Sequence, residues 1–489
     1  MSFISLIYIL FLIVFFTIYW KLNNKNWRNF TLLTASYIFY GWWDARFLIL
    51  IIASSLIDYF CGKKIYNAQL LNKSGKLYLY LSLGFNLGIL GLFKYFNFFV
   101  DNFYNLLNKI GLLTTDPVFL QILLPVGISF YTFQTLSYTI DIYRQELKPS
   151  ESLLEFLTFV SFFPQLVAGP IERAKDLLPQ FSTIHTFNYS QAVRGSYQIF
   201  WGVFKKVAVA DPLGIQFVNP IYKNLANATA PEIFIATIAF ALQIYCDFSG
   251  YSDIAIGTAK LFGFNLSTNF IRPYFSKSPS EFWRRWHISL SSWFRDYVYI
   301  PLGGKRNGIN YTTRNLLITF SLSGLWHGAN WTFIVWGLLN GLSLVPKMIV
   351  TQLFSSTSSD ELPNKSNNYS LVIRNSFAIL TTFSFICLTW IFFRAETVTE
   401  AIIAIGHLFT GYEFNEGIIA VKKLIFTLEG RISLLCVFIL FWAECTNEIS
   451  LNQNFKINKI CRWAFMTILF CIVIIQSRIM SSEFIYFQF

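Results

Sequence analysis

Long apolar runs separated by short polar breaks dominate this sequence. Residues 1–20 contain no charged side chain, and similar runs recur along the chain. They lie near 1–20, 30–42, 46–61, 77–93, 96–113, 118–140, 153–168, 196–218, 232–257, 315–350, 371–393, 432–443 and 463–476. A helix needs about 20 apolar residues to cross a bilayer, so several runs are too short to span it. We therefore expect roughly ten to twelve transmembrane helices, together with re-entrant or interfacial ones.

The charge content indicates that lipid is the solvent of this chain. Only 13% of its residues are charged and 54% are hydrophobic, whereas a soluble domain has about 25% charged residues. The 38 Lys and Arg residues outnumber the 26 Asp and Glu residues, but they are dispersed through the polar breaks. That distribution is typical of cytoplasmic loops rather than of a nucleic-acid-binding stripe. We expect a lipid bilayer as partner and no nucleic acid.

The basic residues near both ends predict a topology. The run at 1–20 lacks the basic start and the small-residue cleavage site of a signal peptide, so we expect it to be retained as a span. Basic residues follow this first run and precede the last one: Lys21, Lys25, Arg28, Lys456, Lys459 and Arg462. Because such residues stay in the cytoplasm, we expect both termini to lie outside.

An all-α integral membrane protein is the predicted fold class. Only helices and closed barrels satisfy backbone polar groups in hydrocarbon, and the runs lack the alternation of barrel strands. With no repeat and no linker, we expect a single membrane domain over 1–489, with a flexible loop at 355–370. The seven cysteines never form a C-x-x-C pair. Neither a disulfide framework nor a metal site is indicated.

The segment RPYFSKSPSEFWRRWHISLSSWFRDYVYIPLGGKRNG at 272–308 combines basic and aromatic residues. If Ser280 caps a helix, His287 falls on its apolar face among Phe282, Trp283 and Trp286. A buried imidazole there needs a partner or a function. The arginines are either interfacial anchors or a clamp for the phosphates of a cytosolic acyl-carrying cofactor. The donor-binding candidates are Arg284, Arg285, Trp286, Lys305 and Arg306.

A second segment, SGLWHGANWTFIVWGLLNG at 323–341, places His327 among small residues inside an apolar run. An ionisable side chain at membrane depth is costly and is by default a functional candidate. Its small neighbours either let helices approach closely or leave room for a substrate chain. Neutral imidazole is well suited to accept a proton near pH 7, so His327 is the preferred general base. His185 and His407 are expected to be ordinary.

A third segment, QIYCDFSGYSDIAIG at 243–257, carries polar residues in an apolar run. Its carboxylates either orient neighbouring groups or carry protons or ions. The candidates for lining a tunnel or orienting the site are Asp247, Ser249, Tyr251, Ser323 and Asn330. An ion-coupled transporter is the alternative of another class. It would use Asp58, Asp141, Asp247 and Asp253 as a relay.

The two histidine segments together resemble the signature of membrane-bound O-acyltransferases. FFPQLVAGPIER at 162–173, YCDFSGYSDIAIG at 245–257 and FIYFQF at 484–489 are similar to the bacterial polysaccharide branch of that family, typified by the alginate O-acetylation protein. The resemblance implies a ring or funnel of helices. It also implies that His327 is the family's histidine of the WHG element and that His287 is its upstream partner.

The same resemblance implies the reaction and its participants. Acetyl-CoA would be the acyl donor, with no bound cofactor, and an exopolysaccharide would be the final acceptor. The enzyme would lie in the bacterial plasma membrane and act through an exported acyltransferase-like protein. The alternative within the family is the D-alanyl transferase of teichoic acid, because both histidines occur there too.

Overall fold

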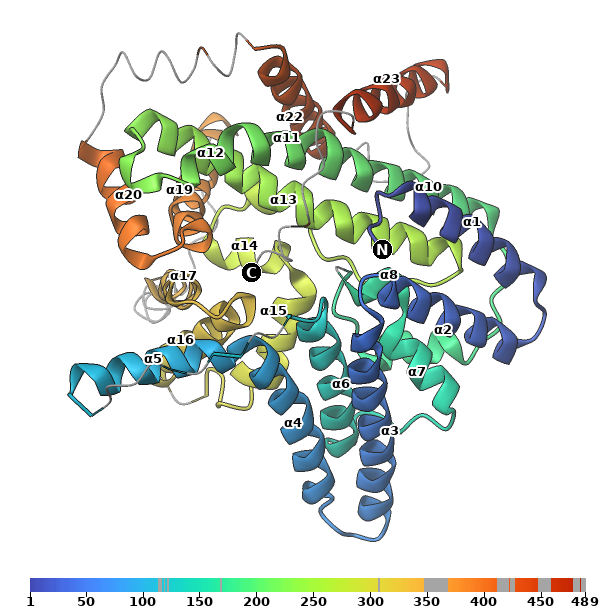
Figure 1. Cartoon of the computed structure of the whole chain (residues 1–489). Coiled ribbons are helices and arrows are strands. Elements are labelled where there is room, and N and C mark those ends of the chain that lie inside the picture. Colours follow the sequence, from blue (N-terminus) through green and yellow to red (C-terminus); the bar gives the residue numbers. More distant parts are fainter. Residues whose placement is uncertain are drawn as a thin grey trace. The chain divides into compact units, whose positions relative to one another are not determined.

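The computed structural model describes residues 1–112, 117, 119–120, 123–167, 169–306, 308–346, 368–410, 422, 427–446, 459–477 and 484. Within these ranges the chain forms helices and turns and contains no strand (Figure 1). The predicted all-α fold class is therefore confirmed. Most of the expected loop at 355–370, and all of 484–489 except Phe484, lie outside the described residues.

The chain packs as two compact units that interleave in sequence. The first contains Met1–Phe200 and Tyr251–Ser267, and the second contains Trp201–Gly250 and Thr268–Phe489. Two of the three boundaries fall within the helices α10 and α13, and the third follows α13. The expected single domain and the expected ring or funnel stay predictions.

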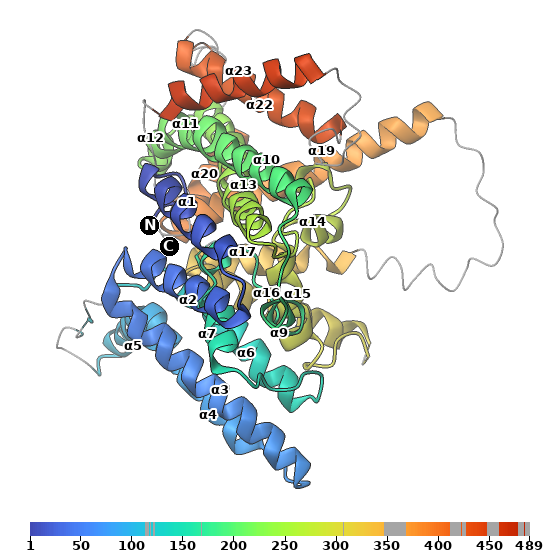
Figure 2. The same ribbon diagram turned by 90° about the vertical axis from the view of Figure 1, so that its right-hand side faces the viewer.

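The first unit consists mostly of helices from the N-terminal part of the chain. They are α1 (Leu6–Lys21), α2 (Lys25–Gly41), α3 (Leu48–Leu70), α4 (Lys76–Leu90), α5 (Phe96–Lys109), α6 (Ile128–Tyr143), α7 (Leu153–Ser161), α8 (Phe163–Leu166), α9 (Ala174–Phe181) and most of α10 (Tyr189–Val203). Helices α3, α4 and α6 lie side by side in both views (Figures 1 and 2). Asp58 of α3 is buried between them and accepts hydrogen bonds from Ser82 Oγ at 2.5 Å and Asn86 Nδ2 at 2.9 Å.

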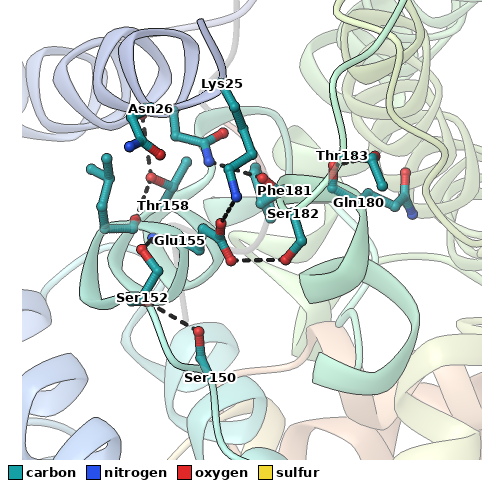
Figure 3. A network of polar contacts seen from close by, with 12 residues as sticks. Lys25, Asn26, Ser150, Ser152, Glu155, Thr158, Gln180, Phe181, Ser182 and Thr183 are labelled. Carbon is teal, nitrogen blue, oxygen red and sulfur yellow. Dashed lines mark hydrogen bonds and ion pairs between the residues drawn. The ribbon is translucent and has the colours of Figure 1, made fainter.

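A polar network joins α2, α7 and α9 in the same unit (Figure 3). Ser152 caps α7 by accepting a hydrogen bond from the backbone N–H of Glu155. The Glu155 carboxylate then pairs with Lys25 Nζ at 2.7 Å and accepts a hydrogen bond from Ser182 Oγ at 2.8 Å. Asn29 Nδ2 completes the link by donating to the carbonyl of Phe181 at 2.9 Å. These contacts hold the start of α2, the start of α7 and the end of α9 together.

The second unit contains both histidine segments. Its helices are α11 (Asp211–Leu213), α12 (Asn219–Tyr222), the first part of α13 (Ala230–Leu261), α14 (Pro279–Arg285), α15 (Ile288–Phe294), α16 (Ile309–His327), α17 (Trp331–Leu342), α19 (Asn368–Arg394), α20 (Val398–Thr410), α22 (Leu428–Thr446) and α23 (Lys459–Ser477). Three π-helical stretches accompany them: η3 (Phe204–Ala210), η4 (Gly214–Val218) and η7 (Arg295–Tyr299).

Helices α16 and α17 pack closely against each other. A Cβ atom added at Gly324 would overlap the carbonyl oxygen of Phe333, and one at Gly337 would overlap that of Phe320. The glycines therefore allow the two backbones to touch. The small residues around His327 were expected either to let helices approach closely or to leave room for a substrate chain. Gly324 serves the first of these roles.

Four described helical segments are long and apolar enough to cross a membrane. They are Ala45–Leu70, Lys76–Lys109, Ala230–Leu261 and Ser370–Arg394. Five shorter apolar helices accompany them: Leu6–Lys21, Leu153–Leu166, Trp331–Leu342, Val398–Thr410 and Thr467–Ser477. The expected number of crossings stays a prediction.

Candidate active site

His327 is the last residue of α16 and is buried in an aromatic enclosure. Its ring centroid lies 5.0 Å from that of Trp326, 5.1 Å from Trp336 and 5.3 Å from Phe393. Helix α16 ends here because Gly328 is extended. A Cβ atom at Gly328 would also overlap the ring of Phe333. The imidazole thus sits at a helix end with rings around it, in a setting of low dielectric.

His287 lies between two short helices rather than inside one. The expected continuous helix capped by Ser280 is wrong. Ser278 is the N-cap of α14, and its side chain accepts the N–H of Glu281. The helix stops at Trp286, which is extended, and His287 adopts a left-handed conformation with φ 43° before α15 begins.

The break at His287 is caused by a distant segment of backbone. The N–H of Ile271 donates to the carbonyl of Arg285 at 2.9 Å, and the N–H of Ile288 donates to the carbonyl of Asn269 at 3.0 Å. These groups are therefore not available to continue the helix through residue 287. The side-chain oxygen of Asn269 also accepts hydrogen bonds from the N–H and Oγ of Ser289, at 3.2 and 2.9 Å.

The side chain of His287 has no hydrogen-bond partner among the described residues. It is 1% exposed, and neither ring nitrogen is bonded. By contrast, His185 Nε2 contacts the carbonyl of Gln180 at 2.8 Å, and His407 Nδ1 contacts that of Ala228 at 3.2 Å. Buried polar groups are nearly always satisfied, and strained backbone persists mainly at functional sites. His287 has both an unsatisfied buried side chain and a strained backbone, so it is a candidate functional residue.

Aromatic rings hold the imidazole of His287. The ring of Phe248 meets it edge to face at a centroid distance of 4.6 Å, and Trp326 lies 5.9 Å away. Phe248 is itself 5.9 Å from Phe484. His287 lies outside the candidate membrane spans, and burial lowers its pKa to about 3. It is therefore a neutral imidazole at physiological pH.

The two histidine rings lie close together. Their ring centroids are 6.3 Å apart, with an angle of 59° between the ring planes. Because a hydrogen bond between a ring nitrogen and an oxygen spans about 2.8–3.0 Å, rings at this separation can contact neighbouring oxygen atoms of one reacting centre. The arrangement can exchange a proton with one of these oxygens and donate a hydrogen bond to the other.

The basic candidates lie in different settings. Arg284, Lys305 and Arg306 are exposed. Arg285 is half-buried, pairs with Glu281 at 2.6 Å and contacts the carbonyl of Arg272 at 3.4 Å, so it already serves the local fold. These settings leave the phosphate clamp and the interfacial anchor as open predictions.

Trp286 differs from the other donor-binding candidates because it is fully buried. Its ring packs among the rings of Tyr245, Phe270, Tyr274, Phe282 and Trp390. This is the environment of a residue that holds α14 against its neighbours. Its expected role in donor binding stays untested.

The tunnel or orienting candidates belong to different helices of the chain. Asn330 caps α17 by accepting the N–H of Thr332, and it also donates to the carbonyl of Glu396 at 3.0 Å. Ser323 is half-buried on α16. Tyr251 belongs to the first unit, and the two histidines belong to the second.

The remaining two candidates lie in the second unit on α13. Ser249 is buried, and its hydroxyl has no hydrogen-bond partner among the described residues. Asp247 forms an ion pair with Lys206 at 2.7 Å.

Sequence reasoning missed two residues that shape this site. Asn269 carries no local signal, because its partners lie about 20 positions further along the chain. Lys206 did carry one. A lysine within the apolar run near 196–218, followed by Asp211, is a costly pair at membrane depth and should have been recognised as a candidate ion pair.

Comparison with known proteins assigns the family. The model of the membrane-bound O-acyltransferase family matches residues 144–390, which include both histidines. The chain belongs to the membrane-bound O-acyltransferase family. As a member of that family, it is a membrane protein and an O-acyltransferase.

Three relatives illustrate where this O-acyltransferase lies within the family. It is 41% identical over 402 residues to the probable alginate O-acetylase of Pseudomonas putida, covering 82% of this chain and 78% of the relative. It is 36% identical over 406 residues to the peptidoglycan O-acetyltransferase of Helicobacter pylori, covering 78% and 73%. It is 31% identical over 236 residues to the teichoic acid D-alanyltransferase of Streptococcus thermophilus, covering 45% and 56%.

Proposed function

We propose that this O-acyltransferase moves an acetyl group from cytosolic acetyl-CoA across the membrane for the O-acetylation of an exported polysaccharide. The observation that carries the proposal is the pair of buried histidines with ring centroids 6.3 Å apart. Two relatives with identities of 41% and 36% over most of the chain are named for O-acetylation. The relative named for D-alanyl transfer matches only 45% of the chain. Acetyl transfer is therefore preferred to D-alanyl transfer.

The proposed chemistry assigns one role to each imidazole. His327 removes the proton of the acceptor hydroxyl while the hydroxyl oxygen attacks the thioester carbonyl carbon. The carbon–sulfur bond then breaks, and the leaving CoA thiolate takes the proton from His327. His287, which is neutral, donates a hydrogen bond to the oxygen that becomes negative in the tetrahedral intermediate. Burial of both rings strengthens these interactions because water does not screen them.

The transporter alternative loses its support. The family carries out acyl transfer, and its members need no ion relay of the four carboxylates. Asp253 accepts a hydrogen bond from Gln198 Nε2 at 2.9 Å. Asp58 accepts hydrogen bonds from Ser82 and Asn86, and Asp247 pairs with Lys206.

The proposal extends to location and partner. The enzyme lies in the bacterial plasma membrane with both termini outside, and an exported acyltransferase-like protein receives the acetyl group before the polysaccharide does. A polymer chain does not easily reach a histidine that is 3% exposed, whereas a single hydroxyl on a partner's extended segment does. Reconstitution tests this step. The purified enzyme with acetyl-CoA and polymer alone should acetylate little sugar, and adding the partner should restore acetylation. Full polymer acetylation by the enzyme alone would contradict the relay.

The histidine assignment is tested in cells. His327→Ala should abolish polymer acetylation while the protein still accumulates in membranes. The matched control is His407→Gln, because His407 Nδ1 contacts the backbone carbonyl of Ala228 and His407 is not part of the histidine pair. Its polymer should stay acetylated. Normal acetylation in the His327→Ala strain would remove the assignment.

A further inference from the structure

A buried ion triad lies in the second unit, which also contains the histidine pair. Lys206 Nζ is 2.7 Å from Asp211 Oδ1 and 2.7 Å from Asp247 Oδ1. The three side chains are 0%, 1% and 2% exposed. Placing three charged groups in such an environment carries a large desolvation cost, which packed apolar residues would avoid. The triad is thus a poor device for stability alone and calls for another role.

The triad joins α13 to the continuous helical segment formed by η3 and α11. Lys206 lies in the π-helical stretch η3 and Asp211 begins α11, whereas Asp247 lies on α13. One turn along α13, a Cβ atom at Gly250 would lie 2.8 Å from the carbonyl oxygen of Gly202 and 3.3 Å from the backbone nitrogen of Lys206. The backbones therefore touch, and the ion pairs fix the rotation of α13 about its own axis.

That rotation sets the position of the ring that holds His287. Phe248 directly follows Asp247, and its ring meets the imidazole of His287 at 4.6 Å with an interplanar angle of 83°. His287 has no hydrogen-bond partner among the described residues, so packing alone orients its ring. A small rotation of α13 would move Phe248 and release the imidazole.

We propose that Asp247, Lys206 and Asp211 are positioning residues that orient His287 through Phe248. The inference rests on the proposed role of His287 in acyl transfer. It assigns the triad no contact with either substrate. The charges act by holding one helix in a single orientation, which apolar packing does less specifically.

The first test separates turnover from substrate binding. Asp247→Asn keeps the shape of the side chain but weakens the ion pair. Its kcat should fall about 10- to 100-fold, since small displacements of a catalytic group have effects of that size, and the KM for acetyl-CoA should stay within about threefold. Asp247→Glu, which keeps the charge, should recover part of the lost turnover.

The control for losing a buried carboxylate is Asp58→Asn. Asp58 is 0% exposed and hydrogen-bonded within the first unit, outside the histidine pair. This variant should keep the kcat of the folded enzyme. Removing one member of a buried ion pair often destabilises a protein strongly, because the other charge is left unpaired. A second variant, Lys206→Met with Asp211→Asn and Asp247→Asn, leaves no unpaired charge and should accumulate with the same loss of kcat.

A spectroscopic readout distinguishes this inference from the proposed function. The chain contains only four histidines, so ¹⁵N-imidazole signals of the full-length enzyme can be assigned with single-histidine variants. Asp247→Asn should shift the His287 signal and leave the His185 signal in place. A fall in kcat with an unchanged His287 signal would overturn the positioning role. An Asp247→Asn variant in which neither kcat nor the His287 signal changes would overturn it too. A shifted His287 signal with normal kcat would support the positioning role and contradict the catalytic role of His287.

Discussion

The imidazole rings of His287 and His327 lie 6.3 Å apart although 40 positions separate them in the chain. Each stands where a helix begins or ends, because His287 precedes α15 and His327 closes α16. Helix ends allow side chains from different elements to converge without a long loop at membrane depth.

Replacing His287 by asparagine should separate folding from catalysis. Asparagine tolerates the left-handed conformation that residue 287 adopts at φ 43°. His287→Asn should therefore accumulate and unfold near the wild-type temperature at pH 7.5, with kcat at least about 100-fold lower, as for the loss of an oxyanion donor. Thermal unfolding in detergent and steady-state kinetics check both parts. Unchanged turnover would exclude a catalytic role for this imidazole.

The stability of the protein should depend on pH through His287. Its pKa is about 3 in the folded state and about 6.5 in an unfolded chain. The neutral His287 makes its full contribution to the free energy of unfolding above pH 6.5. That contribution is lost as the pH falls towards 3. At pH 5 the loss is about 2 kcal/mol. His287→Asn should therefore lose less stability than the wild type between pH 7 and 5. If the wild type and His287→Asn lost the same stability between pH 7 and 5, His287 would not be a neutral buried imidazole in the folded protein.

Asn269 should be needed for the local structure around His287. Its side-chain oxygen accepts two hydrogen bonds from Ser289 at the start of α15. Asn269→Ala should lower the free energy of unfolding by about 1–2 kcal/mol, as the loss of other helix caps does. It should also lower kcat. Asn269→Asp keeps the acceptor and should restore most of both. Thermal unfolding and kinetics on the same preparations provide the comparison. An alanine variant with full stability and full turnover would show that the cap is dispensable.

The contact between α16 and α17 should not tolerate a methyl group. Gly324→Ala would place a Cβ atom against the carbonyl oxygen of Phe333 and should lower stability by about 1–3 kcal/mol. Gly88→Ala in α4 is the matched control, because nothing lies within 4 Å of its added Cβ atom. Membrane accumulation and thermal unfolding should be impaired only by the first change. Equal behaviour of the two variants would refute the close approach.

The exposed basic turn before α16 should affect donor binding. Lys305→Ala with Arg306→Ala should raise the KM for acetyl-CoA about tenfold, since hydrogen bonds to charged groups contribute about 1.5–3 kcal/mol. The effect should shrink as salt is added. Lys73→Ala with Lys76→Ala removes the same charge from an exposed turn of the first unit. If both double variants change KM equally, or neither does, the residues are anchors rather than a clamp.

Local pattern was enough to predict some features of the site and not others. The apolar runs predicted an all-α membrane fold, because hydropathy acts over each segment independently. His327 became a candidate because an ionisable residue in an apolar run is costly wherever the helix packs. The break at His287 was not predicted. Residues 280–294 have the periodicity of one helix, and only the distant pairing with Asn269 and Ile271 interrupts it.

The account's central claim is that His287 and His327 act together in one acyl-transfer step, His327 on the acceptor hydroxyl and His287 on the thioester carbonyl oxygen. A double-mutant cycle on acetyl-CoA cleavage tests it most directly, with the release of free CoA thiol measured for His287→Asn, His327→Asn and the double variant. Residues that act as a unit are strongly non-additive. The account predicts that each single change lowers kcat nearly as far as both together. Independent losses that multiply in the double variant would contradict it.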